Sequence, residues 1–126
     1  MSQVPADLRY TKEHEWVRVG ADGTAVIGIT DHAQSALGDV TFVDLPKPGA
    51  KFAAGQTFGT VESVKAASDL YAPVAFEVIE SNAGLDGSPD LVNREPYAAA
   101  WMIRVRLADP SSVAGLLDAA AYAAVL

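Results

Sequence analysis

The segment from residue 61 to residue 74 holds the residue types best suited to chemistry in this sequence. Lys65 lies between two β-type runs, with small residues beside it and the acids Glu62 and Asp69 nearby. We expect the chain to reverse here, which would leave the Lys65 ammonium in water and leave room for an enzyme to approach it. An ordinary hairpin lysine is the plainer interpretation. A Schiff-base catalyst would need a desolvated lysine with a lowered pKa, which a hairpin tip does not favour.

Other catalytic chemistry finds little support in the residue types. The chain contains no Cys, which excludes disulfides, thiolate catalysis and cysteine-ligated zinc or iron–sulfur clusters. The two histidines, His14 and His32, each lack a neighbouring ligand pair, so we expect no metal site. We also find no nucleophile elbow and no glycine-rich phosphate loop. The residue types therefore provide no further catalytic set that is typical of an enzyme.

The charge and length of the chain exclude further classes of function. The chain of 126 residues has 9 basic and 16 acidic residues, for a net charge of −7 and a pI near 4.6. This balance argues against nucleic acid and anionic membranes as partners. Residues 1–11 show no targeting pattern, and no apolar run approaches the ~20 residues of a membrane span. We expect one domain over residues 1–126, located in the cytoplasm.

The elements that must position Lys65 are predicted to be β-strands. Alternating polar and apolar residues predict strands at 15–19, 24–29, 40–45 and 101–107, with a turn at 20–23. The lysine-bearing hairpin is predicted at about 60–79, with a return strand at 74–79. Turns separate the strands, without strand–helix–strand alternation. This arrangement is typical of a mainly β sandwich or flattened barrel.

Short helices are predicted at three places around these strands. Asp31 followed by Gln34 has the form of a capping box, and Gly38 is placed to end that helix in the left-handed conformation. Asp109 before Pro110, and then Asp118, predict a C-terminal helical region at about 109–126. A further helical turn is predicted from residue 88.

Several blocks of the sequence, in matching order, resemble the glycine cleavage system H-protein family. That family carries lipoic acid on a lysine within Glu-Ser-Val-Lys-Ala, which is found here at 62–66. Further blocks match nearly from end to end, at 14–17, 28–34, 37–39, 42–46, 66–69, 71–74, 88–93 and 96–97 with Trp101. Biotin carriers typically flank the lysine with Met, and lipoyl domains of 2-oxoacid dehydrogenases usually place Asp before it. Val64 and Ala66 stand at those positions here.

The resemblance implies a lipoyl/biotinyl-type barrel-sandwich hybrid with short peripheral and C-terminal helices, acting as a carrier. Lipoic acid would be joined to Lys65 by an amide, placed there by a lipoate-attaching enzyme. The arm would take the aminomethyl group of glycine from a pyridoxal-phosphate glycine decarboxylase to a tetrahydrofolate-dependent aminomethyltransferase. A flavin-containing dihydrolipoamide dehydrogenase would then reoxidise the dithiol. Alternatives are a relay that donates lipoyl groups to other carrier domains, and a structural module with an unmodified Lys65.

Four more residues fall within or beside the matching blocks. The resemblance implies that the lipoate-attaching enzyme recognises Glu62. It makes Glu15, His32 and Asp69 candidates for a cleft that shelters the loaded arm. Plainer interpretations are a solvated strand residue for Glu62 and an exposed strand carboxylate for Glu15. His32 would then be a first-turn helix residue, and Asp69 a turn former.

The sequence departs from the family pattern at two places. Ala75 and Phe76 stand where the family usually has a small residue and then Gly. Either Phe76 joins the apolar face of Val74 and Val78, or the hairpin beside Lys65 is rearranged. The second departure is the run of Ala at 98–100, where the family commonly has Gly.

Overall fold

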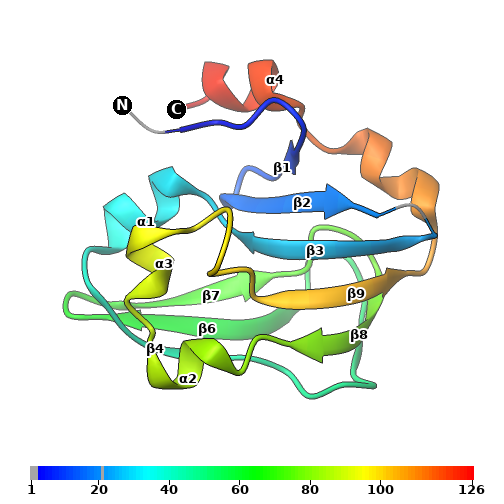
Figure 1. Cartoon of the computed structure of the whole chain (residues 1–126). Helices are drawn as coiled ribbons and strands as arrows, with labels where there is room; N and C mark the ends of the chain where they lie inside the picture. Colours follow the sequence, from blue (N-terminus) through cyan, green and yellow to red (C-terminus); the bar gives the residue numbers. More distant parts are fainter. Residues whose placement is uncertain (1–2, 21) are drawn as a thin grey trace.

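The computed structural model describes residues 3–20 and 22–126, which form two antiparallel sheets (Figure 1). The larger sheet has the strand order β1 (Arg9–Tyr10), β2 (Glu15–Val19), β3 (Thr24–Ile29), β9 (Ile103–Leu107), β8 (Phe76–Ser81), β5 (Lys51–Phe52). The smaller sheet has the order β4 (Val40–Asp44), β6 (Thr57–Ser63), β7 (Ala67–Tyr71). The predicted mainly β fold is thus confirmed.

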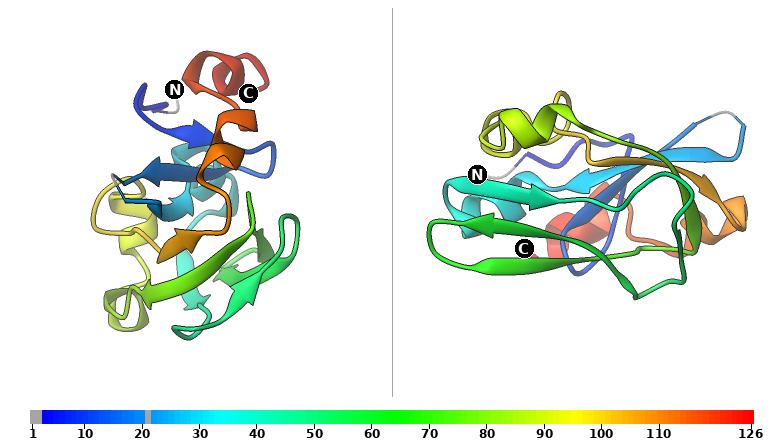
Figure 2. Two further views of the ribbon diagram at one scale, coloured as in Figure 1. Left: turned by 90° about the vertical axis from the view of Figure 1, so that its right-hand side faces the viewer. Right: turned by 90° about the horizontal axis from the view of Figure 1, so that it is seen from below.

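The helical elements are short and lie at the periphery of the sheets (Figures 1 and 2). They are α1 (Asp31–Leu37), α2 (Gly84–Gly87), α3 (Leu91–Arg94), the 3₁₀ helix η1 (Pro110–Gly115) and α4 (Ala119–Ala124). As predicted, Asp109 and Asp118 cap the last two, accepting hydrogen bonds from Ser111 N at 3.1 Å and Ala121 N at 2.8 Å. No helix within the described residues is long and apolar enough to cross a membrane.

Two apolar clusters hold the sheets and the chain ends together. The main cluster draws buried side chains from both sheets, among them Val17, Ile27, Val61 and Leu70. The second cluster consists of Leu8, Tyr10, Trp16 and Tyr122. It joins the start of the chain to α4, and the rings of Tyr10 and Tyr122 stack with centroids 4.5 Å apart. Close packing of this kind gives a rigid base to the hairpin of β6 and β7, which carries Lys65.

The strand predicted at 74–79 is present at residues 76–81, but the prediction that it is the return strand of the lysine hairpin is wrong. The partner of β6 is β7, with Glu62 opposite Ala67 and Thr60 opposite Asp69. Residues 76–81 form β8, which pairs with β5 and β9 in the larger sheet. In β7 only Leu70 is buried, so this strand lacks the alternating apolar pattern that would reveal it in the sequence. The hairpin therefore ends at Tyr71, before the alternating run at 74–79.

Phe76 belongs to the apolar face of β8 and lies outside the lysine hairpin. Its side chain is buried, as are those of Val74 and Val78. Its ring centroid lies 5.7 Å from that of Phe52 and 5.9 Å from that of Phe58. The departure from the family pattern at this position thus fills an aromatic cluster in the core.

The helix after β3 begins one residue earlier than the capping-box pattern indicated. Thr30 is the N-cap, and its hydroxyl accepts a hydrogen bond from Ala33 N at 3.2 Å. Asp31 lies in the first turn and accepts from Gln34 Nε2 at 2.7 Å. Gly38 ends the helix with φ 76° and ψ −156°, a positive φ but not the predicted left-handed helical conformation. Ala21, within the predicted 20–23 turn, lies outside the described residues.

Three of the four sheet edges are short or irregular, the fourth being the five-residue strand β7. In the larger sheet, β1 and β5 are the edge strands and have two residues each. In the smaller sheet, the edge strand β4 has a register shift between Val40 and Phe42 against β6. A shift of this kind is a β-bulge, which inserts one extra residue into a strand and turns the side chains beside it to the other face.

Candidate functional site

Lys65 lies at the tip of the β6–β7 hairpin, and its side chain is exposed. The tip projects at the end of the molecule where α1 and α3 lie (Figures 1 and 2). Within residues 3–20 and 22–126 the ion pairs are Arg94–Asp90 and Arg104–Glu80, neither of which involves Lys65. The amine is thus presented to solvent, as a lysine that another enzyme modifies must be.

The backbone that carries Lys65 is fixed by the side chain of Ser63. The Ser63 hydroxyl accepts hydrogen bonds from Lys65 N at 3.3 Å and Ala66 N at 3.2 Å, and donates to Ala66 O at 3.1 Å. Ser63 N donates to Ala66 O at 2.8 Å, and Val64 N donates to Asp39 O at 3.0 Å. These bonds hold the base of the lysine while its long side chain extends from the turn.

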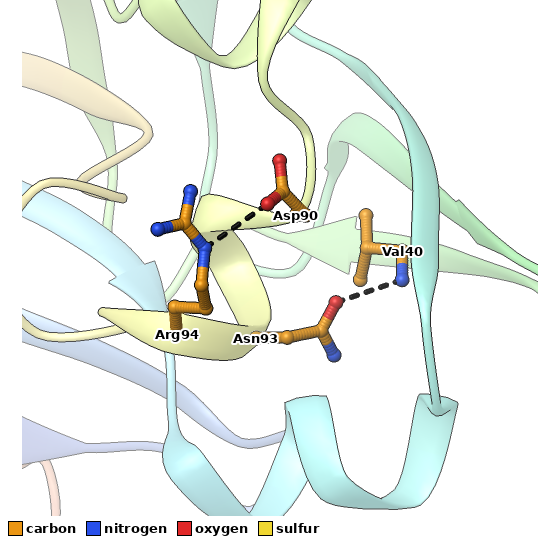
Figure 3. Close-up of polar contacts among 4 residues, drawn as sticks. All are labelled: Val40, Asp90, Asn93 and Arg94. Atoms are coloured by element: carbon orange, nitrogen blue, oxygen red, sulfur yellow. Dashed lines mark hydrogen bonds and ion pairs between the residues drawn. The ribbon is translucent and has the colours of Figure 1, made fainter.

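The stem of Lys65 passes over Gly38, at the end of α1. A Cβ atom added to Gly38 would lie 3.1 Å from Lys65 Cε, so the absence of a side chain leaves room for the lysine. The peptide below is held by Asn93 of α3, whose Nδ2 donates to Gly38 O at 2.8 Å. Asn93 Oδ1 accepts from Val40 N at 2.8 Å, while Arg94 on the same helix pairs with Asp90 (Figure 3). One asparagine thus joins α1, α3 and β4 beneath the lysine.

A cleft of about 160 Å³ lies between α1 and the β6–β7 hairpin. Its apolar lining comes from Ile29, Ala33, Leu37, Val61 and Leu70, among others. Its polar lining comes from Glu13, His14, Glu15, Ser68 and Asp69. The lining residue Leu37 directly precedes Gly38, over which the stem of Lys65 passes. An apolar hollow with a few polar groups is the usual form of a small-ligand site.

Glu15 is a buried carboxyl group in this cleft, with a side chain 1% exposed. Its Oε1 accepts a hydrogen bond from the Thr11 hydroxyl at 2.6 Å, and its Oε2 accepts from Tyr71 N at 3.2 Å. Burial raises the pKa of Glu15 to about 7, because desolvation outweighs these hydrogen bonds. The interpretation of Glu15 as an exposed strand carboxylate is therefore wrong, and its charge is poised to change near neutral pH.

The two histidines lie together, although neither has a neighbouring ligand pair in the sequence. Their ring centroids are 4.6 Å apart, and His14 has a positive φ of 70°. His14 Nδ1 lies 2.7 Å from the hydroxyl of Tyr122, which lies 2.7 Å from Thr30 Oγ1. Burial, and then the nearby His32, lower the pKa of His14. This network connects the C-terminal helix to the wall of the cleft.

The structure brings together two of the three candidate cleft residues. Glu15 and Asp69 both line the cleft. His32 is not one of the lining residues, but its ring packs on that of His14, which does line the cleft. Sequence reasoning missed His14, although His14 begins one of the matching blocks. It also missed Tyr122, which stands in an alanine-rich stretch without a motif.

Glu62 lies outside the cleft, exposed on β6 with Phe42 and Ala67 opposite it on the neighbouring strands. Its side chain is therefore available to a protein that approaches the hairpin from outside.

Comparisons with known proteins show which family the chain resembles. The family model described as Glycine cleavage H-protein matches residues 8–126. The "Glycine cleavage system H protein" of Opitutus terrae is 62% identical over 126 residues, which is 100% of this chain and 99% of that protein. The protein of the same name from Escherichia coli O7:K1 is 56% identical, covering 100% of this chain and 98% of its own length.

A solved structure supports the same assignment. The crystal structure of a glycine cleavage system H protein from Mycobacterium marinum matches with a TM-score of 0.88 and 39% sequence identity, covering 97% of this chain and 98% of that one. The lysine-bearing hairpin, the two-sheet fold and these matches over nearly the whole length lead to one assignment. The chain belongs to the glycine cleavage H-protein family, whose members are lipoyl carriers and not enzymes.

Proposed function

We propose that Lys65 carries lipoic acid through an amide. We also propose that the loaded arm moves the aminomethyl group of glycine from the pyridoxal-phosphate glycine decarboxylase to the tetrahydrofolate-dependent aminomethyltransferase. Dihydrolipoamide dehydrogenase then reoxidises the dithiol. The observation that carries the proposal is the exposed Lys65 amine, on a turn fixed by Ser63 beside a cleft.

The residues around Lys65 fit a lipoyl group. When bound, the group supplies a disulfide to a chain that has no Cys. Attachment requires an activated lipoyl donor, such as an acyl adenylate, and a lysine amine that has lost a proton. The bond from Lys65 Nζ to the acyl carbon forms as the bond from that carbon to its leaving group breaks. An amine extended into solvent can reach such a donor inside another enzyme.

The cleft residues are suited to hold the far end of a loaded arm. The apolar walls of Leu37, Val61 and Leu70 exclude water from that end. An aminomethyl group bears an amine, which carries positive charge when protonated. Ionised Glu15 and Asp69 attract such a charge, and the near-neutral pKa of Glu15 lets it accept or return a proton at physiological pH.

Intact mass tests the attachment directly. Protein produced in a host that makes lipoate is compared with Lys65→Ala and with the control Lys51→Ala, in which another exposed lysine is removed. We expect a lipoyl-sized increment in the wild type and in Lys51→Ala, and none in Lys65→Ala. A wild-type chain without the increment, or a modified Lys65→Ala, would contradict the proposal. Glycine cleavage reconstituted with the three partner enzymes then tests the shuttle.

A further inference from the structure

Exposure alone does not distinguish Lys65 from the other lysines of this chain. All four lysines, Lys12, Lys47, Lys51 and Lys65, are exposed. An enzyme that modifies only Lys65 must therefore recognise the surface around it. The attaching enzyme meets the protein before any arm exists, and it must bring the lysine amine itself into its active site. Partners that act on the far end of a finished arm have no such requirement.

The surface beside Lys65 carries two exposed apolar side chains. Val64, next to the lysine, is 68% exposed, and Phe42 on β4 is 49% exposed. Glu62 lies between them, because it is opposite Phe42 across the β4–β6 ladder and two residues before Val64. We call Phe42, Glu62 and Val64 the hairpin strip. An exposed aromatic side chain of this kind is a typical anchor at protein interfaces.

The outward direction of Phe42 is produced by the bulge in β4. Simple alternation would place Val40 and Phe42 on one face and Thr41 and Val43 on the other. The register shift between Val40 and Phe42 inserts an extra residue. Val40 and Val43 are both buried as a result, while Phe42 is exposed beside Glu62. The chain thus uses a local irregularity to expose a phenylalanine next to the modified lysine, as bulges near functional sites commonly re-aim a side chain.

We infer that the hairpin strip is the docking surface for the lipoate-attaching enzyme, an inference that rests on the proposed function. The carboxylates around the strip determine the partner's chemistry. Glu62 lies within it, and Asp39 and Asp44 are exposed close to it in the chain, Asp39 next to Val40 and Asp44 two residues beyond Phe42. The complementary surface on the attaching enzyme is an apolar hollow with a basic rim. The Phe42 ring fills the hollow while Lys65 enters the active site, and added salt weakens the contact.

Kinetics of lipoylation test the strip. A purified lipoate–protein ligase, with lipoate and ATP, is assayed on wild type, Phe42→Ser, Phe42→Leu and Val19→Ser. Val19 is a matched control, because it is 50% exposed at the end of β2 away from the hairpin tip (Figure 1). We expect Phe42→Ser to raise KM about tenfold with kcat unchanged, as loss of an anchor that binds without reacting does. Phe42→Leu should recover most of the loss, and Val19→Ser should match the wild type.

Two results would overturn the inference while leaving the proposed function intact. One is a Phe42→Ser protein with wild-type KM, and the other is a Val19→Ser protein impaired as strongly as Phe42→Ser. If the wild type itself accepts no lipoyl group, both proposals fail. Fully lipoylated Phe42→Ser should be reoxidised by dihydrolipoamide dehydrogenase at the wild-type rate. A tenfold loss there would show a general docking surface and contradict a role specific to attachment.

Discussion

The Lys65 side chain lies over Gly38, and a Cβ atom added to that glycine would lie only 3.1 Å from Lys65 Cε. Gly38→Ala should destabilise the protein by about 1–2 kcal/mol, because a φ of 76° is strained for alanine. The added methyl should also displace the lysine stem and lower kcat/KM for lipoylation several-fold. Gly49→Ala is the control, since Gly49 has φ 93° and nothing within 4 Å of an added Cβ. Equal lipoylation of the two variants would show that the contact has no effect.

Ser63 fixes the turn that carries the lysine, so its hydroxyl should matter for modification. Ser63→Ala removes three hydrogen bonds of the hydroxyl and should cost about 1–2 kcal/mol of stability. We expect faster hydrogen exchange at the Lys65 and Ala66 amides and a several-fold lower kcat/KM for lipoylation. Ser63→Thr keeps the hydroxyl and should retain most of both properties. Unchanged exchange in Ser63→Ala would refute this account of the turn.

The buried carboxyl of Glu15 should give the fold a measurable dependence on pH. Its pKa rises from the usual 4.5 to about 7 on folding, so the folded state favours the protonated form. This contribution to stability is complete below pH 4.5 and is lost as the pH rises through 7. Relative to wild type, Glu15→Gln should gain up to about 3 kcal/mol in free energy of unfolding between pH 4 and pH 8.

Urea unfolding at several pH values measures this difference. Comparing the variant with wild type at each pH cancels the contributions to stability that both proteins share. One of these is the contribution of His14, whose lowered pKa makes the folded state less stable as the pH falls below the usual 6.5. Glu62→Gln, at an exposed carboxylate, should show no comparable change. A Glu15→Gln difference that is flat with pH would mean that Glu15 keeps an ordinary pKa.

Tyr122 connects the C-terminal helix to the cleft through its hydroxyl. Tyr122→Phe leaves His14 and Thr30 without that partner and should lower the free energy of unfolding by about 1–2 kcal/mol. The imidazole NMR signals of His14 should also shift and titrate differently. Tyr71→Phe is the control, because within the described part of the chain the Tyr71 hydroxyl makes no side-chain hydrogen bond. Identical His14 titrations in wild type and Tyr122→Phe would exclude the connection.

The sequence predicted the class of fold and the position of the lysine turn, because both depend on local patterns. It failed for β7, since a strand with only Leu70 buried has no alternation to detect. It also failed for the burial of Glu15. Alternation along 15–19 predicts one open face, yet Glu15, Trp16 and Val17 are all buried.

That burial depends on residues far along the chain. Trp16 packs with Tyr122, and the Glu15 carboxyl accepts a hydrogen bond from the Tyr71 backbone. The pairing of His14 with His32 has the same origin, because it needs the β2–β3 hairpin to place both rings at one end of the sheet. Contacts between residues distant in sequence leave no local pattern that composition or spacing could reveal.

The short edge strands of the larger sheet bear on how the protein behaves when concentrated. An exposed, regular strand edge is a template on which another chain can add a strand, which leads to aggregation. Here β1 and β5 offer only two residues each, and the bulge interrupts the edge at β4. A second copy thus finds no long row of unpaired amides at these three edges. The same irregularity that exposes Phe42 therefore also discourages strand addition at the β4 edge.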